Sequence, residues 1–176
     1  MKPIITDASP EDLAAITRIY AEAVLHGRAS FELQPPDEDE MRRRFDNLVD
    51  KNFPYLVAHV DNQVAGYAYA ASYRERPAYR WVVENSVYVN EDFHGRGIGG
   101  ALLDRLIEEC TQKDFRQMIA VIGDSDNIGS IRLHEKAGFT HTGVLRAMGR
   151  KHGLWLDTVL MQLALGKGSD APPLDE

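Results

Sequence analysis

The residues best placed to do chemistry form a glycine-rich turn near the middle of the chain. Four glycines separate an apolar run at residues 87–89 from a helical repeat that begins at Ala101: Gly95, Gly97, Gly99 and Gly100. Glycine lets backbone N–H groups approach a ligand closely, and the unpaired amides and dipole of a helix N-terminus favour negative charge. Arg96 adds a positive charge inside the same turn. The sequence therefore predicts a phosphate-binding site here.

The spacing of these glycines can be compared with known phosphate-binding turns. A P-loop needs a lysine followed by serine or threonine, and neither follows Gly99-Gly100. Gly95, Gly97 and Gly100 satisfy the dinucleotide pattern G-x-G-x-x-G, with Asp124 near the distance of a ribose-binding acid. That pattern opens a doubly wound domain, whereas a long N-terminal segment precedes the turn in this chain. The dinucleotide match is therefore weak.

An acidic residue lies in the apolar strand that leads to the turn. Glu84 falls within the predicted strand 81–89, where burial would raise its pKa toward a value useful to a general base. The alternative is a cross-strand ion pair with a nearby arginine. Arg74, Arg76 and Arg80 precede the strand in an irregular segment. They could bind a carboxylate or be plain surface charge.

The composition is that of an ordinary globular protein. The chain has 176 residues, 44% hydrophobic and 27% charged, with a formal net charge of −7. This balance argues against nucleic acid or an anionic membrane as a partner, because both need a basic surface. No run reaches the length of a membrane helix, and Met1-Lys2-Pro3 has no apolar signal core. The single cysteine, Cys110, excludes an intrachain disulfide, fits a reducing cytoplasm and is expected in the core.

The elements that position these residues follow from apolar periodicity and from start and stop signals. Helices are predicted over 9–27, over 37–50, from the glycine turn to about Gln112, and from a cap at 124–127 to Gly138. Strands are predicted at 4–5, 55–60, 63–71, 81–89, 117–122, 139–150 and 154–163. This order predicts an α+β fold in one domain over residues 1–165, with a mixed, mostly antiparallel sheet and helices on both faces. Residues 166–176 are expected to be a disordered tail.

Two motifs in this frame carry a family resemblance. Val87-Tyr88-Val89 with the x-x-Gly-x-Gly turn resembles the acetyl-coenzyme A motif of the GNAT acetyltransferase superfamily. Asn127 to Ser130, followed by Leu133 to Phe139, resembles its second signature. His134 stands where many members have tyrosine. This histidine and the segments 81–84, 86–89 and 151–153 together resemble the phosphinothricin acetyltransferase branch of the family. That branch acetylates the α-amine of glutamate-like or methionine-like analogues.

The resemblance covers nearly the whole chain and implies acetyl-coenzyme A as cosubstrate; no metal ion is expected. In the family, the amides of the turn hold the diphosphate and the preceding strand pairs with the pantetheine arm. The residues that inherit cofactor contacts are Val87, Tyr88, Val89, His94, Gly95, Arg96, Gly97, Ile98, Gly99, Gly100, Asn127 and Ser130. Asn127 could instead cap its helix, and Ser130 could simply belong to the first turn. His94 departs from the family, which usually has glutamine or arginine there.

Acetyl transfer to an amine suggests roles for further residues. Glu84 is the candidate base for an α-ammonium group, and the N–H of Val89 or of a neighbour is the candidate oxyanion donor. His134 is a candidate acid, relay or alternative base, unless it is a buried core histidine. The candidate substrate contacts are Phe31, Glu32, Tyr73, Arg74, Arg80 and Asn85. Relatives are homodimers, so Lys151, His152 and Trp155 could complete a partner's pocket.

The leading hypothesis is an acetyl-coenzyme A-dependent N-acetyltransferase acting by direct attack in a ternary complex. Its substrate would be a small amino acid or analogue, such as phosphinothricin, methionine sulfone or methionine sulfoximine. The alternatives are a GNAT enzyme for another amine (an aminoglycoside, a polyamine or a protein N-terminus) and a coenzyme A-binding module without catalysis. The arginine-rich segment 73–80 favours a substrate with a carboxylate. The presence of both Glu84 and His134 speaks against the module.

Overall fold

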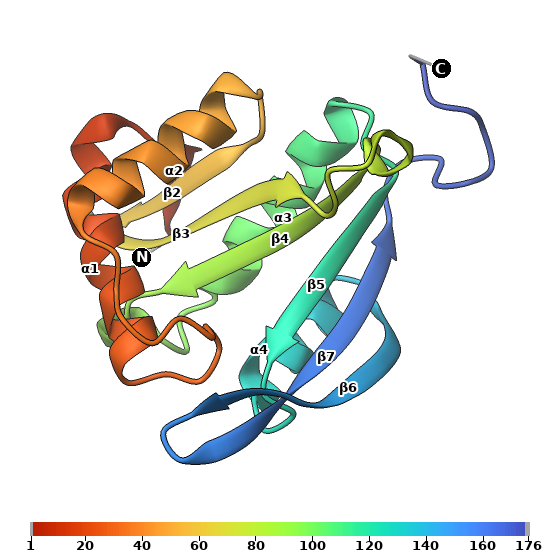
Figure 1. Ribbon diagram of the computed structural model, residues 1–176. Coiled ribbons are helices and arrows are strands. Elements are labelled where there is room, and N and C mark those ends of the chain that lie inside the picture. The colour runs from red at the N-terminus through yellow and green to blue at the C-terminus, as the bar shows by residue number, and fades with distance from the viewer. Residues whose placement is uncertain (1, 175–176) are drawn as a thin grey trace.

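A seven-stranded sheet forms the centre of the computed structural model, which describes residues 2–174 (Figure 1). The strand order is β1-β2-β3-β4-β5-β7-β6, and every neighbouring pair is antiparallel except β4 and β5. The strands are β1 (Ile4–Asp7), β2 (Tyr55–Val60), β3 (Gln63–Ser72), β4 (Val82–Val89), β5 (Gln117–Gly123), β6 (Thr140–Lys151) and β7 (Leu154–Ala164). The expected mixed, mostly antiparallel sheet is confirmed.

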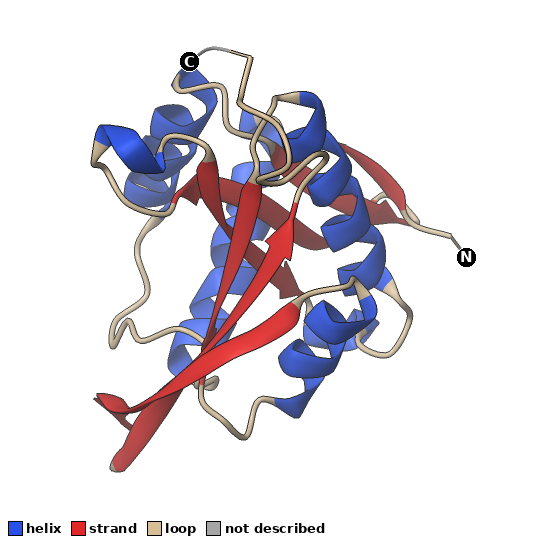
Figure 2. Cartoon of the chain, turned by 90° about the vertical axis from the view of Figure 1, so that its right-hand side faces the viewer, coloured by secondary structure: helices blue, strands red, loops and turns tan. Residues whose placement is uncertain are grey.

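Helices cover both faces of this sheet (Figure 2). They are α1 (Leu13–Leu25), α2 (Glu38–Asp50), α3 (Ile98–Gln112) and α4 (Ile128–Lys136). One buried cluster joins α1 and α2 to the tyrosines of β2 and β3. A larger cluster joins α3 to the opposite face, and Cys110 lies fully buried within it, as expected. Among residues 2–174, no helix has the length and apolarity needed to cross a bilayer.

Local signals account for where these elements begin and turn. Ser9 and Asp12 form a capping box before α1, with Asp12 Oδ2 accepting from the Ser9 N–H at 2.8 Å. Asp37 caps α2 by accepting from the Glu40 N–H at 2.9 Å. Asp61 and Asn62 join β2 to β3 with positive φ values of 50° and 60°, the backbone of a tight hairpin. These starts and turns agree with those predicted.

The two parallel strands separate partway along their length. The pairing of β4 with β5 runs from Val82–Gln117 to Asn85–Ala120 and stops there, although both strands continue. Figure 1 shows the two strands diverging toward their carboxyl ends. We call the space between the diverging halves of β4 and β5 the strand gap.

The backbone of β4 is oriented by its pairing with β3. Tyr73 N donates to Val82 O, and Asn90 N donates to Ala65 O, so the even-numbered residues of β4 direct their backbone groups toward β3. The odd-numbered residues direct theirs toward β5. Val87 therefore presents its N–H and C=O groups to the strand gap, and so does the next odd-numbered residue, Val89.

The side chains of β4 alternate between the two faces of the sheet. Tyr88 packs against Tyr20 of α1, with ring centroids 5.1 Å apart, which places Glu84 on the same face. Val83 belongs to the buried cluster around α3, and Asn85 shares its face. Glu84 and Asn85 thus stand on opposite faces of the sheet where the strands part.

The C-terminal segment has neither helix nor strand over residues 166–174. Pro172 O accepts a hydrogen bond from Arg116 Nη2 at 2.8 Å, and Leu174 N donates to Asp114 Oδ2 at 2.8 Å. Both contacts lie at the end of the sheet away from the strand gap. Met1, together with Asp175 and Glu176 of the expected tail, lies outside the described residues.

Candidate active site

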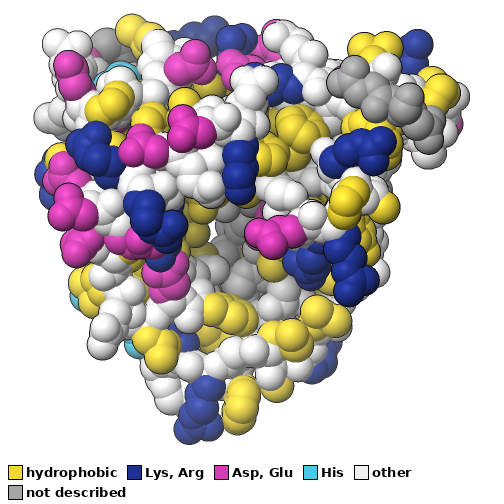
Figure 3. Space-filling view, turned by 45° about the horizontal axis from the view of Figure 1, so that its top comes forward, with side chains coloured by type: hydrophobic (Ala, Val, Ile, Leu, Met, Phe, Trp, Pro, Cys, Tyr) yellow, Lys and Arg dark blue, Asp and Glu magenta, His cyan; other side chains and the backbone are white. Residues whose placement is uncertain are grey.

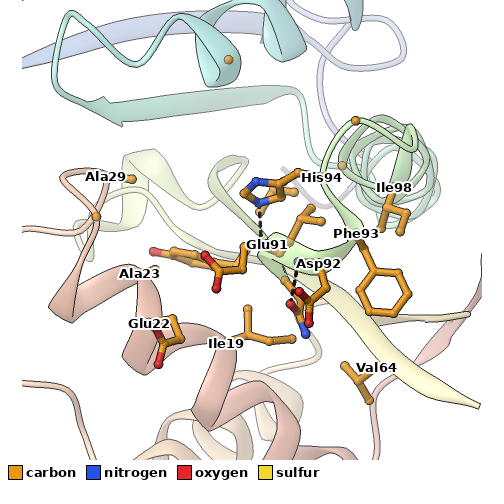
Figure 4. A pocket seen from close by; sticks show the side chains of 18 of the residues that line it. Ile19, Glu22, Ala23, Ala29, Val64, Glu91, Asp92, Phe93, His94 and Ile98 are labelled. Atoms are coloured by element: carbon orange, nitrogen blue, oxygen red, sulfur yellow. Dashed lines mark hydrogen bonds between the residues drawn. The ribbon is translucent and has the colours of Figure 1, made fainter.

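A cleft of about 1290 Å³ extends from the glycine turn along β4 to the start of α4 (Figure 4). All the candidate cofactor residues line it except Arg96. Arg96 donates from Nη2 to Asp92 O at 2.9 Å, and its guanidinium lies 5.0 Å from the centre of the Phe93 ring. Arg96 therefore packs along its own turn, while the other candidates come together around one open space.

Backbone geometry explains the glycines of the turn. Gly95 and Gly97 have φ values of +75° and +77°, a region that side chains rarely tolerate. Gly97 caps α3, and the first hydrogen bond of the helix runs from Ala101 N to Gly97 O at 3.1 Å. The amides of residues 98–100 precede that bond and have no partner inside the helix. These unpaired amides suit an anion, at the turn for which the sequence predicts one.

His94 connects the turn to the end of β4. Its Nε2 lies 3.0 Å from Val89 O, while the ring itself is exposed (Figure 4). The contact occupies the Val89 carbonyl and leaves the Val89 N–H facing the strand gap. His94 thereby holds the turn against the end of β4 at the edge of the cleft.

Asn127 and Ser130 stand where α4 begins, on the far side of the cleft. Asn127 Oδ1 accepts from the Ser130 N–H at 3.2 Å, so the capping alternative is realised in the structure. Asn127 Nδ2 lies 3.4 Å from Gly123 O, a long contact that leaves the amide facing the cleft. The Asn127 side chain is thus held by its oxygen, and its nitrogen remains the part able to meet a ligand.

Glu84 lies half-buried on the face of α1 and α2. Burial raises the pKa of its carboxyl group, and the positive charge of Arg74 partly opposes that rise. Within residues 2–174, Glu84 makes no ion pair shorter than 4 Å. The predicted alternative, a cross-strand ion pair, is therefore not formed. Figure 3 shows a hollow near the middle of this side of the molecule, with charged side chains of both signs on its rim.

The arginines before β4 take different positions. Arg74 lies 4.3 Å from the centre of the Tyr73 ring and donates to Tyr73 O at 3.0 Å, so these two candidates form one unit. Arg80 stacks on Trp81, 3.5 Å from the ring centre, and donates to Pro77 O at 3.2 Å. Arg80 is thus directed back onto its own segment, whereas the charge of Arg74 acts on Glu84.

His134 and Asn85 meet on the opposite face of the sheet. His134 Nε2 lies 3.0 Å from Asn85 Oδ1, and His134 Nδ1 lies 2.8 Å from Ser130 O. Asn85 Nδ2 donates to Ile119 O on β5 at 3.1 Å. Burial lowers the pKa of His134, and the hydrogen bond to Ser130 partly opposes that fall. Both ring nitrogens are therefore engaged by oxygens of the protein itself.

Phe31 and Glu32 belong to a loop, residues 27–32, that crosses the strand gap. Phe31 packs on the β6 backbone at Gly149, where an added Cβ would lie 2.6 Å from its ring. Glu32 accepts from Tyr20 Oη at 2.9 Å and from Arg44 Nη1 at 2.7 Å. We call this segment the crossing loop.

Two residues from other elements of the fold also hold the crossing loop. Lys151 is 4% exposed and donates from Nζ to Ser30 O at 2.8 Å, so it is buried within its own chain. Arg44 of α2 binds Glu32 as well as Glu40. The spacing of Glu40 and Arg44, four residues apart on a helix, signals one of these pairs. No local pattern signals the other, because Glu32 lies outside that helix.

Comparison with known proteins identifies the family of the chain. A family model described as an acetyltransferase (GNAT) domain matches residues 5–160. Phosphinothricin N-acetyltransferase of Alcaligenes faecalis is 50% identical over 163 residues, which are 93% of this chain and 83% of that protein. L-methionine sulfoximine/L-methionine sulfone acetyltransferase of Salmonella typhimurium is 40% identical over 158 residues, 90% of this chain and 92% of that protein.

A solved structure agrees with these matches. The crystal structure of a GNAT superfamily phosphinothricin acetyltransferase from Sinorhizobium meliloti in complex with acetyl-CoA has a TM-score of 0.97 and 46% identity. The alignment covers 99% of this chain and 95% of that one. Fold, motifs and sequence identity agree along nearly the whole chain, and we conclude that it belongs to the GNAT acetyltransferase family.

Proposed function

We propose that this protein transfers the acetyl group of acetyl-coenzyme A to the α-amine of a small amino acid or analogue, of the phosphinothricin, methionine sulfone or methionine sulfoximine type. One observation carries the proposal: the strand gap adjoins the cleft at the glycine turn, and its lining includes Ser86 and Tyr88, which share the sheet face of Glu84. The substrates named for the relatives support the acceptor class.

The residues around the cleft fit acetyl-coenzyme A. The amides of residues 98–100 suit a diphosphate, because they are unpaired within the helix and lie at its positive end. The backbone groups of Val87 suit the amides of a pantetheine arm, with the Asn127 amide opposite them. When bound, acetyl-coenzyme A supplies an activated thioester. The Val89 N–H faces the strand gap and can donate to the oxygen that becomes negative.

Glu84 would deprotonate the acceptor, and Arg74 would bind its carboxylate. An α-ammonium group must lose a proton before it can attack, and a carboxylate with a raised pKa can accept that proton directly or through one water. Arg74 beside Glu84 suits the acceptor's carboxylate, with Tyr73 packed against its guanidinium. Phe31 and Glu32 on the crossing loop would close over the acceptor.

His134 and Asn85 would act differently from the other candidates. Neither nitrogen of His134 is free to reach a leaving thiolate while both face protein oxygens. We assign His134 a positioning role, with Asn85 as the side chain that it fixes. Asn85 lies on the face opposite Glu84, so a contact with the amino acid head group does not suit its position.

A homodimer also fits the surface of β6 and β7. β6 is the last strand in the sheet order, and it leaves apolar side chains exposed: Leu145, Met148, Leu154 and Trp155. An open edge strand with exposed apolar groups is a surface that a second copy could cover. Trp155, at 63% exposed, is the residue most available to a partner.

The proposal is tested by thiol release from acetyl-coenzyme A with three acceptors: methionine sulfone, phosphinothricin and spermidine. We expect turnover with the two amino acid analogues and little with spermidine. Turnover with spermidine alone would replace the amino acid assignment by another amine. Binding of acetyl-coenzyme A in calorimetry without any turnover would instead indicate a binding module.

Gly149→Ala should weaken binding of the acceptor without weakening binding of acetyl-coenzyme A. An added Cβ would meet three atoms of the Phe31 ring at 2.6–3.2 Å, so that ring must move. We expect the KM for methionine sulfone to rise several-fold and the KM for acetyl-coenzyme A to stay constant. Gly143→Ala, on the same strand with nothing within 4 Å of its added Cβ, is the matched control. Equal KM values in both variants would contradict a role for Phe31 at the acceptor.

A further inference from the structure

The strand gap ends in a small pocket of about 60 Å³. Its walls come from β4, β5, the start of α4 and Ala29 of the crossing loop. The pocket shares several lining residues with the large cleft, Val87, Asn127 and Ser130 among them, so the two spaces adjoin. The cleft of about 1290 Å³ admits a large ligand, whereas this pocket has room for only a few atoms.

Asn85 and His134 close the inner end of this pocket. Both line it, and they are only 6% and 4% exposed. Asn85 belongs to the last pair of β4 with β5, opposite Ala120, so the pocket begins where the ladder stops.

Hydrogen bonds fix both side chains of this wall. The Ile119 carbonyl can only accept, so the Asn85 amide must turn its nitrogen to Ile119 and its oxygen to His134. Asn85 Oδ1 accepts from the His134 Nε2–H, so the neutral ring has no proton left on Nδ1, which lies 2.8 Å from Ser130 O. The ring also packs edge-on against Phe139, with ring centroids 5.0 Å apart. Neither side chain can move aside without losing the buried hydrogen bond that joins Asn85 to His134. The wall is therefore rigid.

We infer that Asn85 and His134 form the wall against which the acyl group of the thioester comes to rest, and that they restrict that group to acetyl. The inference rests on the proposed function. A longer acyl group would have to displace one of the two side chains, because the close-packed interior offers no other space. One additional methylene group typically changes discrimination by about 10-fold to 200-fold in a site of this kind.

The test compares acetyl-coenzyme A with propionyl-coenzyme A in the wild-type protein and in two variants, His134→Ala and Asn85→Ser. Calorimetry gives the Kd of each thioester and of coenzyme A, and thiol release with methionine sulfone gives kcat/KM. In wild type we expect acetyl to be favoured over propionyl by about tenfold or more. In both variants the preference should fall at least fivefold, while the Kd of coenzyme A is unchanged. His141→Ala and Asn47→Ala remove the same residue types from exposed positions on β6 and α2 and should keep the wild-type preference.

Several outcomes would overturn the inference. A wild-type protein that binds and uses both thioesters equally has no such wall. Variants that unfold cooperatively at near-wild-type temperature and still keep the full preference would show that the two side chains serve only packing. If His134→Ala does not fold, the smaller change Asn85→Ser decides. A protein that releases no thiol with any amino acid acceptor contradicts the proposed function instead, and the calorimetric comparison of the two thioesters still tests the wall.

Discussion

Glu84→Gln should lower kcat for methionine sulfone about a hundredfold or more at neutral pH, with the Kd for acetyl-coenzyme A unchanged. Glutamine keeps the size of the side chain and cannot accept the amine's proton. Because burial raises the pKa of Glu84, the wild-type kcat/KM should fall as the pH drops through that raised value and the carboxylate becomes protonated. The variant should lack this acidic limb, and its residual rate should follow the deprotonation of the amine alone.

A measurement of thermal stability distinguishes this loss of kcat from misfolding of the variant. A carboxyl group whose pKa is higher in the folded than in the unfolded chain costs folding free energy once the pH rises above its ordinary value of 4.5. Glu84→Gln removes that cost, so its Tm at neutral pH should equal or exceed that of wild type. Glu108→Gln, on the exposed face of α3, is the control and should leave kcat unchanged. A Glu84→Gln variant with near-wild-type kcat across the pH range would show that another group is the base.

Gly97→Ala should weaken coenzyme A binding by about tenfold or more, equivalent to about 1.4 kcal/mol. Gly97 has a φ of +77°, so a side chain there strains the turn whose amides face the cleft. Its added Cβ would touch no protein atom within 4 Å and would stand in open space at the cleft. Titration calorimetry with coenzyme A measures the effect without any acceptor.

Gly153→Ala is a closely matched control for this experiment. Gly153 turns the β6–β7 hairpin with a φ of +76°, and its added Cβ would also meet nothing within 4 Å. Both variants should lose a similar stability, about 1–2 kcal/mol for a left-handed alanine. Only Gly97→Ala should lose affinity for coenzyme A. Equal affinities in the two variants would mean that the diphosphate lies elsewhere, and the proposed function would fail with it.

The sequence determined the features that depend on neighbours along the chain. The capping box at Ser9 and Asp12, the cap at Asp37 and the glycine turn before α3 each need only residues within about one helical turn. The motifs around the turn and around Asn127 were sufficient to indicate the family, since each is a short contiguous pattern. The helix start at the glycine turn and the carboxylate on an apolar strand were predicted for the same reason.

Only the tertiary structure decided which distant groups meet and on which face. Asn85 and Glu84 are adjacent in sequence, yet strand alternation sends one toward His134 and the other toward Arg74. Lys151 reaches Ser30 across 121 positions of the chain, a contact that no local pattern encodes. The strand gap itself exists because the pairing of β4 with β5 ends at Asn85, and strand register is set by the packing of the whole sheet. For that reason the sequence indicated which residues could carry the chemistry, and the fold determined how they are arranged around the gap.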